Sequence, residues 1–135
     1  MSRWIVLTAG VLGILGVAIG AYAAHGLEAL LGKQGLEAAE ILKRLDQCEV
    51  AVRYHMLHTL ALLAIGLSPA IQGRRRTNAA ALLMLLGIAL FSGGLYSMVF
   101  LGEIGHWAIV PSGGLCLLMG WCWVASLACG RKLEG

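Results

Sequence analysis

The chain has 135 residues, of which 59% are hydrophobic and only 13% are charged, with a formal net charge of +3. A soluble domain is roughly half apolar and a quarter charged, so these charges are too few to cover a water-exposed surface. The positive charges are also local, with three consecutive arginines at 74–76 and with Arg131 and Lys132 near the end. This pattern is typical of membrane topology determinants and not of a nucleic-acid surface. We therefore expect an integral membrane protein whose main partner is the lipid bilayer.

Four stretches are long and apolar enough to cross a bilayer, which takes about 20 residues. They run over residues 4–24, 50–71, 78–101 and 107–129. The first also has features of a signal peptide, because Arg3 precedes the apolar run and Ala-Tyr-Ala follows at 21–23, but the run exceeds the usual length of about 7–15 residues. The connections around Arg74 and Gly105 are short, so the spans that they join should be antiparallel neighbours. The sequence predicts a single all-α domain over residues 1–135, a bundle of four transmembrane helices.

The segment between the first two spans, residues 25–49, is expected to lie outside the hydrocarbon core. Gly32 and Gly35 bracket a break. After the break, apolar residues recur at helical spacing, and Glu40 and Arg44 are placed for an ion pair between positions i and i+4. This pattern predicts an interfacial amphipathic segment that continues into span two. Its charges are interpreted as a solvated face.

The orientation follows from the distribution of lysine and arginine, which is richer on the cytoplasmic side. The side that holds the N-terminus, the second loop and the C-terminus carries six basic residues, namely Arg3, Arg74, Arg75, Arg76, Arg131 and Lys132. The other side carries Lys33, Lys43, Arg44 and, at the membrane edge, Arg53. The sequence therefore predicts that both termini are cytoplasmic, in a bacterial plasma membrane.

With this topology the four histidines fall at the outer membrane face. His25 ends span one, Tyr54, His55 and His58 begin span two, and His106 precedes span four. In one interpretation, each histidine makes an interhelical hydrogen bond, worth about 0.6–2 kcal/mol. In the other, His25 and His58, together with His55 or His106, bind a metal, a haem or a quinone headgroup, because neutral imidazole is the commonest metal-ligating side chain. Both interpretations stay open at this point.

Small residues in the spans are expected to pack helices closely, because they let two backbones approach one another. The candidates are Gly16, Gly20 and Ala24 at four-residue spacing in span one, Gly93 and Gly94 in span three, and Gly113 and Gly114 in span four. The two glycine pairs are candidates to face each other across a tight helix crossing.

These residues together resemble a family of small membrane proteins called domain of unknown function 423, which includes transmembrane protein 256-like proteins. The matching pieces are GAYAAHGL at 20–27, Tyr54 with His58-Thr59-Leu60-Ala61, LFSGGLY at 90–96 and VPSGGLCLLMGW at 110–121. The resemblance covers nearly the whole chain and implies a four-helix membrane protein, and it assigns no reaction. His55 and His106 lie outside the family pattern, which favours a site built from His25 and His58.

Three functions are compatible with the sequence. The first is non-enzymatic: a structural or accessory protein that packs in the membrane with itself, as a homo-oligomer, or with a larger complex. The second is a protein with a metal, haem or quinone site at the outer face, built on His25 and His58. The third is a small-solute channel formed by an oligomer. An ion-coupled transporter is disfavoured, because the deep parts of the predicted spans contain no Asp, Glu, Lys or Arg.

Overall fold

The computed structural model describes residues 1–69, 75–102 and 107–129, and within these ranges it is almost entirely helical, with no β-strand. The elements are α1 (Arg3–Tyr22), a π-helical turn η1 (Ala23–Leu27), α2 (Glu28–Lys33), α3 (Ala38–Leu67), α4 (Arg75–Leu101) and α5 (Ile109–Cys129). Four of the helical segments are long and apolar enough to cross a membrane. This confirms the predicted all-α fold with four spans. A helix suits a bilayer because it satisfies its backbone hydrogen bonds internally.

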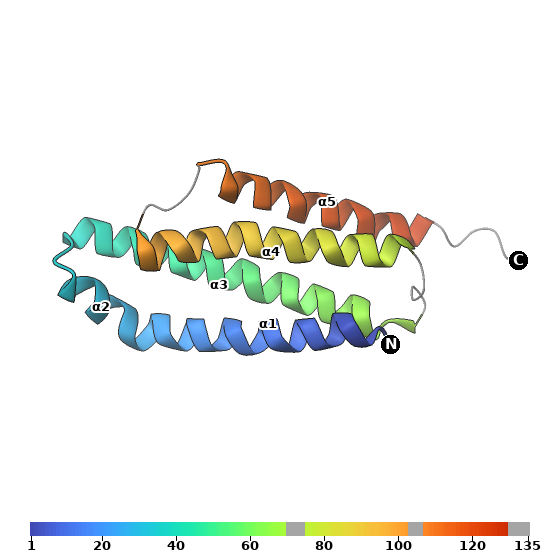
Figure 1. Cartoon of the computed structure of the whole chain (residues 1–135), viewed down its shortest axis with the longest axis horizontal. Coiled ribbons are helices and arrows are strands. Elements are labelled where there is room, and N and C mark those ends of the chain that lie inside the picture. The colour runs from blue at the N-terminus through green and yellow to red at the C-terminus, as the bar shows by residue number, and fades with distance from the viewer. Residues whose placement is uncertain (70–74, 103–106, 130–135) are drawn as a thin grey trace, which may run out of the picture.

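The four long helices lie side by side in the order α1, α3, α4, α5, so that α3 and α4 are inner helices and α1 and α5 are outer helices (Figure 1). The outer helix α1 packs mainly on α3, and α5 packs mainly on α4. Neighbours in this order run in opposite directions (Figure 1), which confirms the expected antiparallel pairing of spans two and three and of spans three and four.

The first helix does not end at His25, so this expectation was wrong. Residues 23–27 form one π-helical turn, and the helix then continues to Lys33. The chain turns out of the line of α1 at this point (Figure 1), as is common where a π-helical turn interrupts an α-helix. The break falls instead between Lys33 and Ala38, where Gly35 adopts a φ of 72°. A positive φ is readily adopted only by glycine, so the helix ends where the glycine permits the turn.

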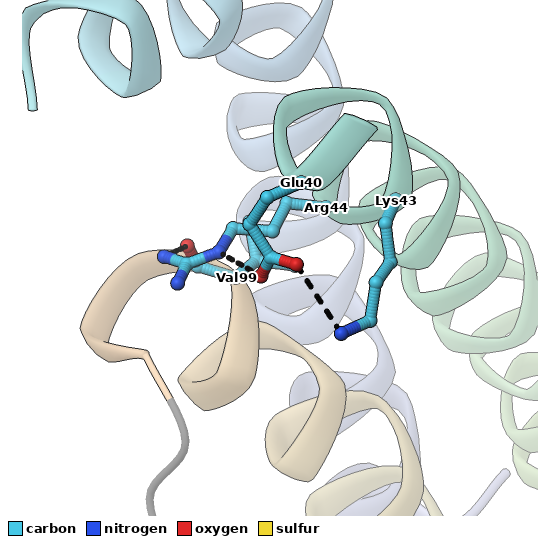
Figure 2. A network of polar contacts seen from close by, with 4 residues as sticks. All are labelled: Glu40, Lys43, Arg44 and Val99. Carbon is cyan, nitrogen blue, oxygen red and sulfur yellow. Dashed lines mark hydrogen bonds and ion pairs between the residues drawn. The ribbon is translucent and has the colours of Figure 1, made fainter. Parts of the chain in front are cut away.

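The helix α3 starts well before the expected start of span two at residue 50 and runs without interruption to Leu67. The predicted continuation of the amphipathic segment into span two is therefore confirmed. Its first turns carry charged side chains, and Glu40 forms ion pairs with Arg44 at 3.0 Å and Lys43 at 3.3 Å. Arg44 also donates to the backbone oxygen of Val99 at 3.3 Å (Figure 2). The last carbonyls of a helix lack intrahelical donors, so Arg44 caps α4 and ties the start of α3 to its end.

Glycines bring α4 and α5 into close contact. A Cβ atom on Gly113 would lie 2.8 Å from the carbonyl carbon of Leu90, so only glycine fits there without moving the backbone of α4. A Cβ on Gly94 would lie 2.9 Å from a methyl group of Val110. The other members of the two expected pairs are less crowded. A Cβ on Gly93 would meet no atom of α5 within 4 Å, and one on Gly114 would meet only the ring of Phe91, at 3.8 Å.

Two further glycines at this interface, Gly87 and Gly120, were not among the predicted packing residues. A Cβ on Gly87 would lie 2.6 Å from Leu117 Cγ, and one on Gly120 would lie 3.0 Å from Met84 Cγ. Each glycine is seven residues from another, Gly87 from Gly94 and Gly120 from Gly113. The signal that could have found them is this seven-residue spacing, which keeps residues on one side of a helix pair.

Of the three small residues predicted to pack on span one, two contact a neighbouring helix and one does not. Gly16 lies against Met56 and the His55 ring of α3, and a Cβ on Gly20 would lie 3.3 Å from Val52 Cγ1. Ala24 falls in the π-helical turn and is exposed. The four-residue spacing therefore predicted two contacts with α3, at Gly16 and Gly20. The third predicted contact, at Ala24, is absent because the π-helical turn changes the direction in which that residue points.

Candidate functional site

The polar side chains of the apolar helices gather on the inner helices α3 and α4. His55, His58 and Thr59 of α3 and Ser92 of α4 are all buried. A polar side chain within a membrane segment is costly when it faces lipid, so it turns toward neighbouring helices. These residues form two distinct environments, one around His58 and one around His55.

His58 uses both of its ring nitrogens. Nδ1 lies 2.7 Å from the backbone oxygen of Tyr54, and because a carbonyl can only accept, Nδ1 carries the proton and donates. Nε2 therefore has a free lone pair, and it accepts a hydrogen bond from Trp121 Nε1 at 3.1 Å. The rings of His58 and Trp121 meet edge to face at 6.0 Å. His58 is thus a neutral imidazole that joins α3 to α5.

A groove lies beside this bond, between α3 and α5, and we call it the α3–α5 groove. Its lining residues are Tyr54, Leu57 and His58 of α3, Phe91 of α4, and Pro111, Gly114, Leu115, Leu117, Leu118 and Trp121 of α5, and its volume is about 530 Å³. The Tyr54 ring packs on Phe91 at 4.7 Å and stacks on His58 at 5.9 Å. The walls are therefore mostly aromatic and aliphatic, with the His58–Trp121 bond closing one end.

His55 faces the opposite neighbours. Its Nδ1 lies 3.1 Å from the Tyr96 hydroxyl of α4, and its Cδ2 edge lies against Gly16 of α1. Its Nε2 makes no hydrogen bond of normal geometry among the described residues, but the backbone of Leu12 on α1 is close enough to interact with the ring by hydrogen bonding. The hydroxyl oxygen of Ser92 on α4 is buried without a partner among the described residues. His55 therefore contacts both α4 and α1.

His25 lies apart from both environments. It is exposed in the π-helical turn and lines a different groove, of about 620 Å³, with residues of α2 and the first turns of α3 such as Glu28 and Ile41. The structure therefore does not bring His25 together with His58, which lies in the second half of α3, opposite Trp121 of α5. His106 lies outside the described residues. Within the described ranges, no group of three or more His, Cys, Asp or Glu side chains is placed to hold a metal ion.

Two partners of the buried histidines, Trp121 and Tyr96, were absent from the predicted polar cluster, as was the buried Ser92. Trp and Tyr each carry a polar group that needs a partner when it is buried, so a mid-span Trp and a mid-span His are natural candidates to pair. Periodicity within each helix could not show which of them meet, because that depends on how the helices pack. Trp121, Tyr96 and Ser92 all stand at positions of the family resemblance described above.

The comparisons with known proteins agree with the membrane fold. Residues 19–114 match the family described as "Protein of unknown function (DUF423)". A UPF0382 membrane protein of Haemophilus influenzae is 39% identical over 110 residues, which cover 81% of this chain and 80% of the relative. The UPF0382 inner membrane protein YgdD of Escherichia coli K12 is 34% identical, covering 99% and 95% of the two chains.

A UPF0382 membrane protein of the yeast Schizosaccharomyces pombe is also 34% identical, covering 90% of this chain and 96% of the relative. No solved structure matches this chain. Four apolar helices of spanning length, a family match over most of the sequence and relatives named as membrane proteins lead to one conclusion. The chain is an integral membrane protein and belongs to the DUF423 family.

Proposed function

We propose that the protein is a helix-packing component of the membrane, without catalytic activity, that associates through its outer helices with a second copy or with a larger membrane complex. The observation that carries this proposal is that both nitrogens of His58 are already hydrogen-bonded: Nδ1 bonds to the backbone of Tyr54 within α3, and Nε2 bonds to Trp121 of α5 and so joins the two helices. A metal or haem at His58 Nε2 would first have to displace the indole N–H.

The outer helices support association. In their most apolar windows α1 and α5 bury 17% of their residues, whereas α3 and α4 bury 39%. The exposed face of α5 carries large apolar side chains, among them Leu115, Leu118 and Met119. Helices associate in a bilayer through van der Waals packing, so a helix that is packed mainly on one neighbour has room for a second contact.

Cys122 offers a direct test, because it is free and exposed on α5 whereas Cys48 is buried on α3. We would carry out oxidative cross-linking in native membranes with a Cys116→Ala, Cys129→Ala variant, and native electrophoresis in mild detergent. The proposal expects disulfide-linked dimers through Cys122, lost on Cys122→Ala, or a species larger than a monomer. A monomer in both experiments would contradict it.

We propose further that both termini are cytoplasmic. Arg3, Arg75 and Arg76 lie at the starts of α1 and α4, at one end of the bundle (Figure 1), and Lys33 and Lys43 lie at the other. The excess of basic residues in the sequence is at the first end, which favours the cytoplasm for that end. Fusions of alkaline phosphatase and of green fluorescent protein to the C-terminus test this. Fluorescence without phosphatase activity is expected, and the reverse would overturn it.

A second candidate function is binding of a quinone-type ring in the α3–α5 groove. Tyr54 lines this groove, and its hydroxyl is a hydrogen-bond donor that a carbonyl oxygen in the groove could accept from. The volume falls within the range of about 300–1,000 Å³ that is usual for small-molecule sites. Quenching of tryptophan fluorescence by a short-chain quinone should saturate, and Tyr54→Phe should weaken it. Linear quenching that is the same in both proteins would exclude this site. The oligomeric channel stays a prediction, because no described contact favours it.

A further inference from the structure

Another groove lies between the end of the first helix and α3, and we call it the α1–α3 groove. Its lining residues are Gly20 of α1, Ala23 and Ala24 of the π-helical turn, and Leu45, Glu49, Val52 and Arg53 of α3, and its volume is about 390 Å³. Most of this lining is small or aliphatic, and two of its members, Glu49 and Arg53, are charged. The groove is therefore an apolar channel with one ion pair at its wall.

The ion pair lies near one edge of the hydrocarbon core. Ser2 N donates to Gly66 O at 2.8 Å, so the start of α1 is level with the end of α3. At a rise of about 1.5 Å per residue, Arg53 lies about 20 Å and Glu49 about 26 Å along α3 from Gly66. The core of a bilayer is about 30 Å thick. The two side chains are therefore close to the level at which lipid headgroups begin.

The side chains of this pair are open to the bilayer. Glu49 is 68% exposed and Arg53 is 60% exposed, and Arg53 Nη2 donates to Glu49 Oε1. An ion pair this exposed contributes little to the stability of the protein. Its opposite charges are therefore free to rearrange around a ligand at little cost.

The order of the two charges matches one kind of headgroup. Glu49 lies one helical turn nearer the water, and Arg53 lies one turn nearer the hydrocarbon. In phosphatidylethanolamine the primary ammonium is at the water end, and the phosphate lies between it and the acyl chains. The planar fork of an arginine suits a phosphate, and a carboxylate accepts hydrogen bonds from an ammonium. Both headgroup charges would thus meet an opposite charge.

Other common headgroups fit this order less well. The quaternary ammonium of phosphatidylcholine has no N–H to donate to Glu49, and phosphatidylglycerol has no cation at all. The α1–α3 groove also adjoins the groove that His25 lines, because both include Ala23, Ala24 and Leu45. That neighbouring groove adds a second carboxylate, Glu28, which favours a cationic group at the water end.

We propose that the α1–α3 groove binds one molecule of phosphatidylethanolamine, with the phosphate at Arg53, the ammonium at Glu49 and the start of one acyl chain beside Gly20 and Val52. The small side chains of the π-helical turn leave the space that the lipid fills. This inference does not depend on association through the outer helices, because the groove lies between helices of one chain.

Native mass spectrometry of the full-length protein in mild detergent tests this, with phosphatidylethanolamine, phosphatidylcholine and phosphatidylglycerol of the same acyl chains. Arg53→Gln removes the phosphate contact, and Lys43→Gln is its matched control, because Lys43 forms a similar exposed pair with Glu40. The double variant Glu49→Arg, Arg53→Glu keeps the ion pair and the net charge but reverses the order of the charges.

The wild type is expected to bind phosphatidylethanolamine more tightly than the other two lipids. Arg53→Gln should lower its apparent affinity about threefold to tenfold, whereas Lys43→Gln should not change it. The double variant should lose the preference for the ethanolamine headgroup. Equal binding of the three lipids to the wild type would overturn the proposal, and so would a preference that survives in the double variant.

A second pair of variants tests the groove itself. Ala24→Trp places a large ring in the groove and should abolish the preferred lipid adduct. Ala21→Trp is the control, because Ala21 is exposed in the last turn of α1 and outside the lining. An Ala24→Trp protein that binds the lipid as the wild type does would contradict the site. If it also lost a dimer that the wild type forms, the occupant of the groove would be a second copy of the chain.

Discussion

The two histidines of α3 lie three residues apart and occupy different surroundings. His58 faces α5 across the α3–α5 groove and has both nitrogens bonded, so it fastens an outer helix to the inner pair. His55 faces α4 and α1, with one nitrogen at the Tyr96 hydroxyl and the other edge of its ring directed at the backbone of α1. Two histidines one helical turn apart on α3 thus connect it to different neighbours, α5 in one case and α4 with α1 in the other.

The largest effect is expected at the contact that holds α5 against α4. Gly113→Leu would place a side chain against the backbone of Leu90 and Phe91, which cannot move aside. Overpacking costs about 1–3 kcal/mol, and more where backbone must shift, so we expect about 3 kcal/mol or more of lost stability, measured as unfolding in mixed micelles. Because α5 would separate, the His58 environment should be lost while the His55 environment persists. Gly93→Leu is the control, since Gly93 meets no atom of α5, and equal losses in the two variants would contradict this account.

The next largest loss of stability is expected at the hydrogen bond between Trp121 and His58. Trp121→Phe keeps most of the ring but removes the N–H that His58 Nε2 accepts, and should cost about 1–2 kcal/mol. Trp123→Phe is a matched control, because Trp123 is exposed on the same helix and its indole makes no hydrogen bond within the described residues. The free energies of unfolding of both variants test this. A control that loses as much as Trp121→Phe would show that ring size matters and the hydrogen bond does not.

A somewhat smaller effect is expected on the His55 side. Tyr96→Phe removes the hydroxyl that meets His55 Nδ1 and should cost about 0.5–1.5 kcal/mol. Tyr22→Phe is the control, because Tyr22 is exposed and contacts Phe100 through its ring. The unfolding midpoints of the two variants are compared with that of the wild type. An unchanged Tyr96→Phe protein would mean that the His55 contact contributes nothing to stability.

The smallest effect is expected outside the hydrocarbon core. Arg44→Ala removes both the cap on Val99 and the pair with Glu40, and should cost about 0.5–1 kcal/mol. Lys43→Ala loses only an exposed pair, for which we expect about 0–0.5 kcal/mol. Hydrogen exchange at the last turn of α4 should rise in Arg44→Ala alone. A rise in both variants would show that the cap is not specific to Arg44.

The sequence predicted correctly those features that depend on one helix and its surroundings alone. The length and composition of the apolar stretches gave the number of spans, and helical periodicity after Gly35 predicted that the amphipathic segment joins span two. Both depend on a single helix and its solvent. The end of span one was misplaced at His25, because nothing in residues 20–27 distinguishes a π-helical turn that continues from a helix that stops.

The candidate site was harder to predict because it depends on contacts between helices. The sequence predicted that His55 and His58 belong to one polar cluster, yet α1 packs mainly on α3 and α5 mainly on α4, which separates their environments. Pairing His25 with His58 assumed that both lie at one membrane face. In the structure His58 faces α5 through Trp121, whereas His25 is exposed in the π-helical turn and lines a different groove. The partner Trp121 is 63 residues from His58 in the sequence, and no pattern within either helix indicates the match.

The most direct test of the central claim, that His58 serves helix packing, is the protonation state of its ring. Nitrogen NMR of histidine-labelled protein in nanodiscs distinguishes the two neutral tautomers. The account predicts that His58 carries its proton on Nδ1, that Nε2 is an unprotonated acceptor, and that the Nε2 signal shifts in Trp121→Phe. A proton on Nε2, or a nitrogen signal that is insensitive to Trp121→Phe, or a metal or haem bound to the purified protein and lost in His58→Ala, would contradict it.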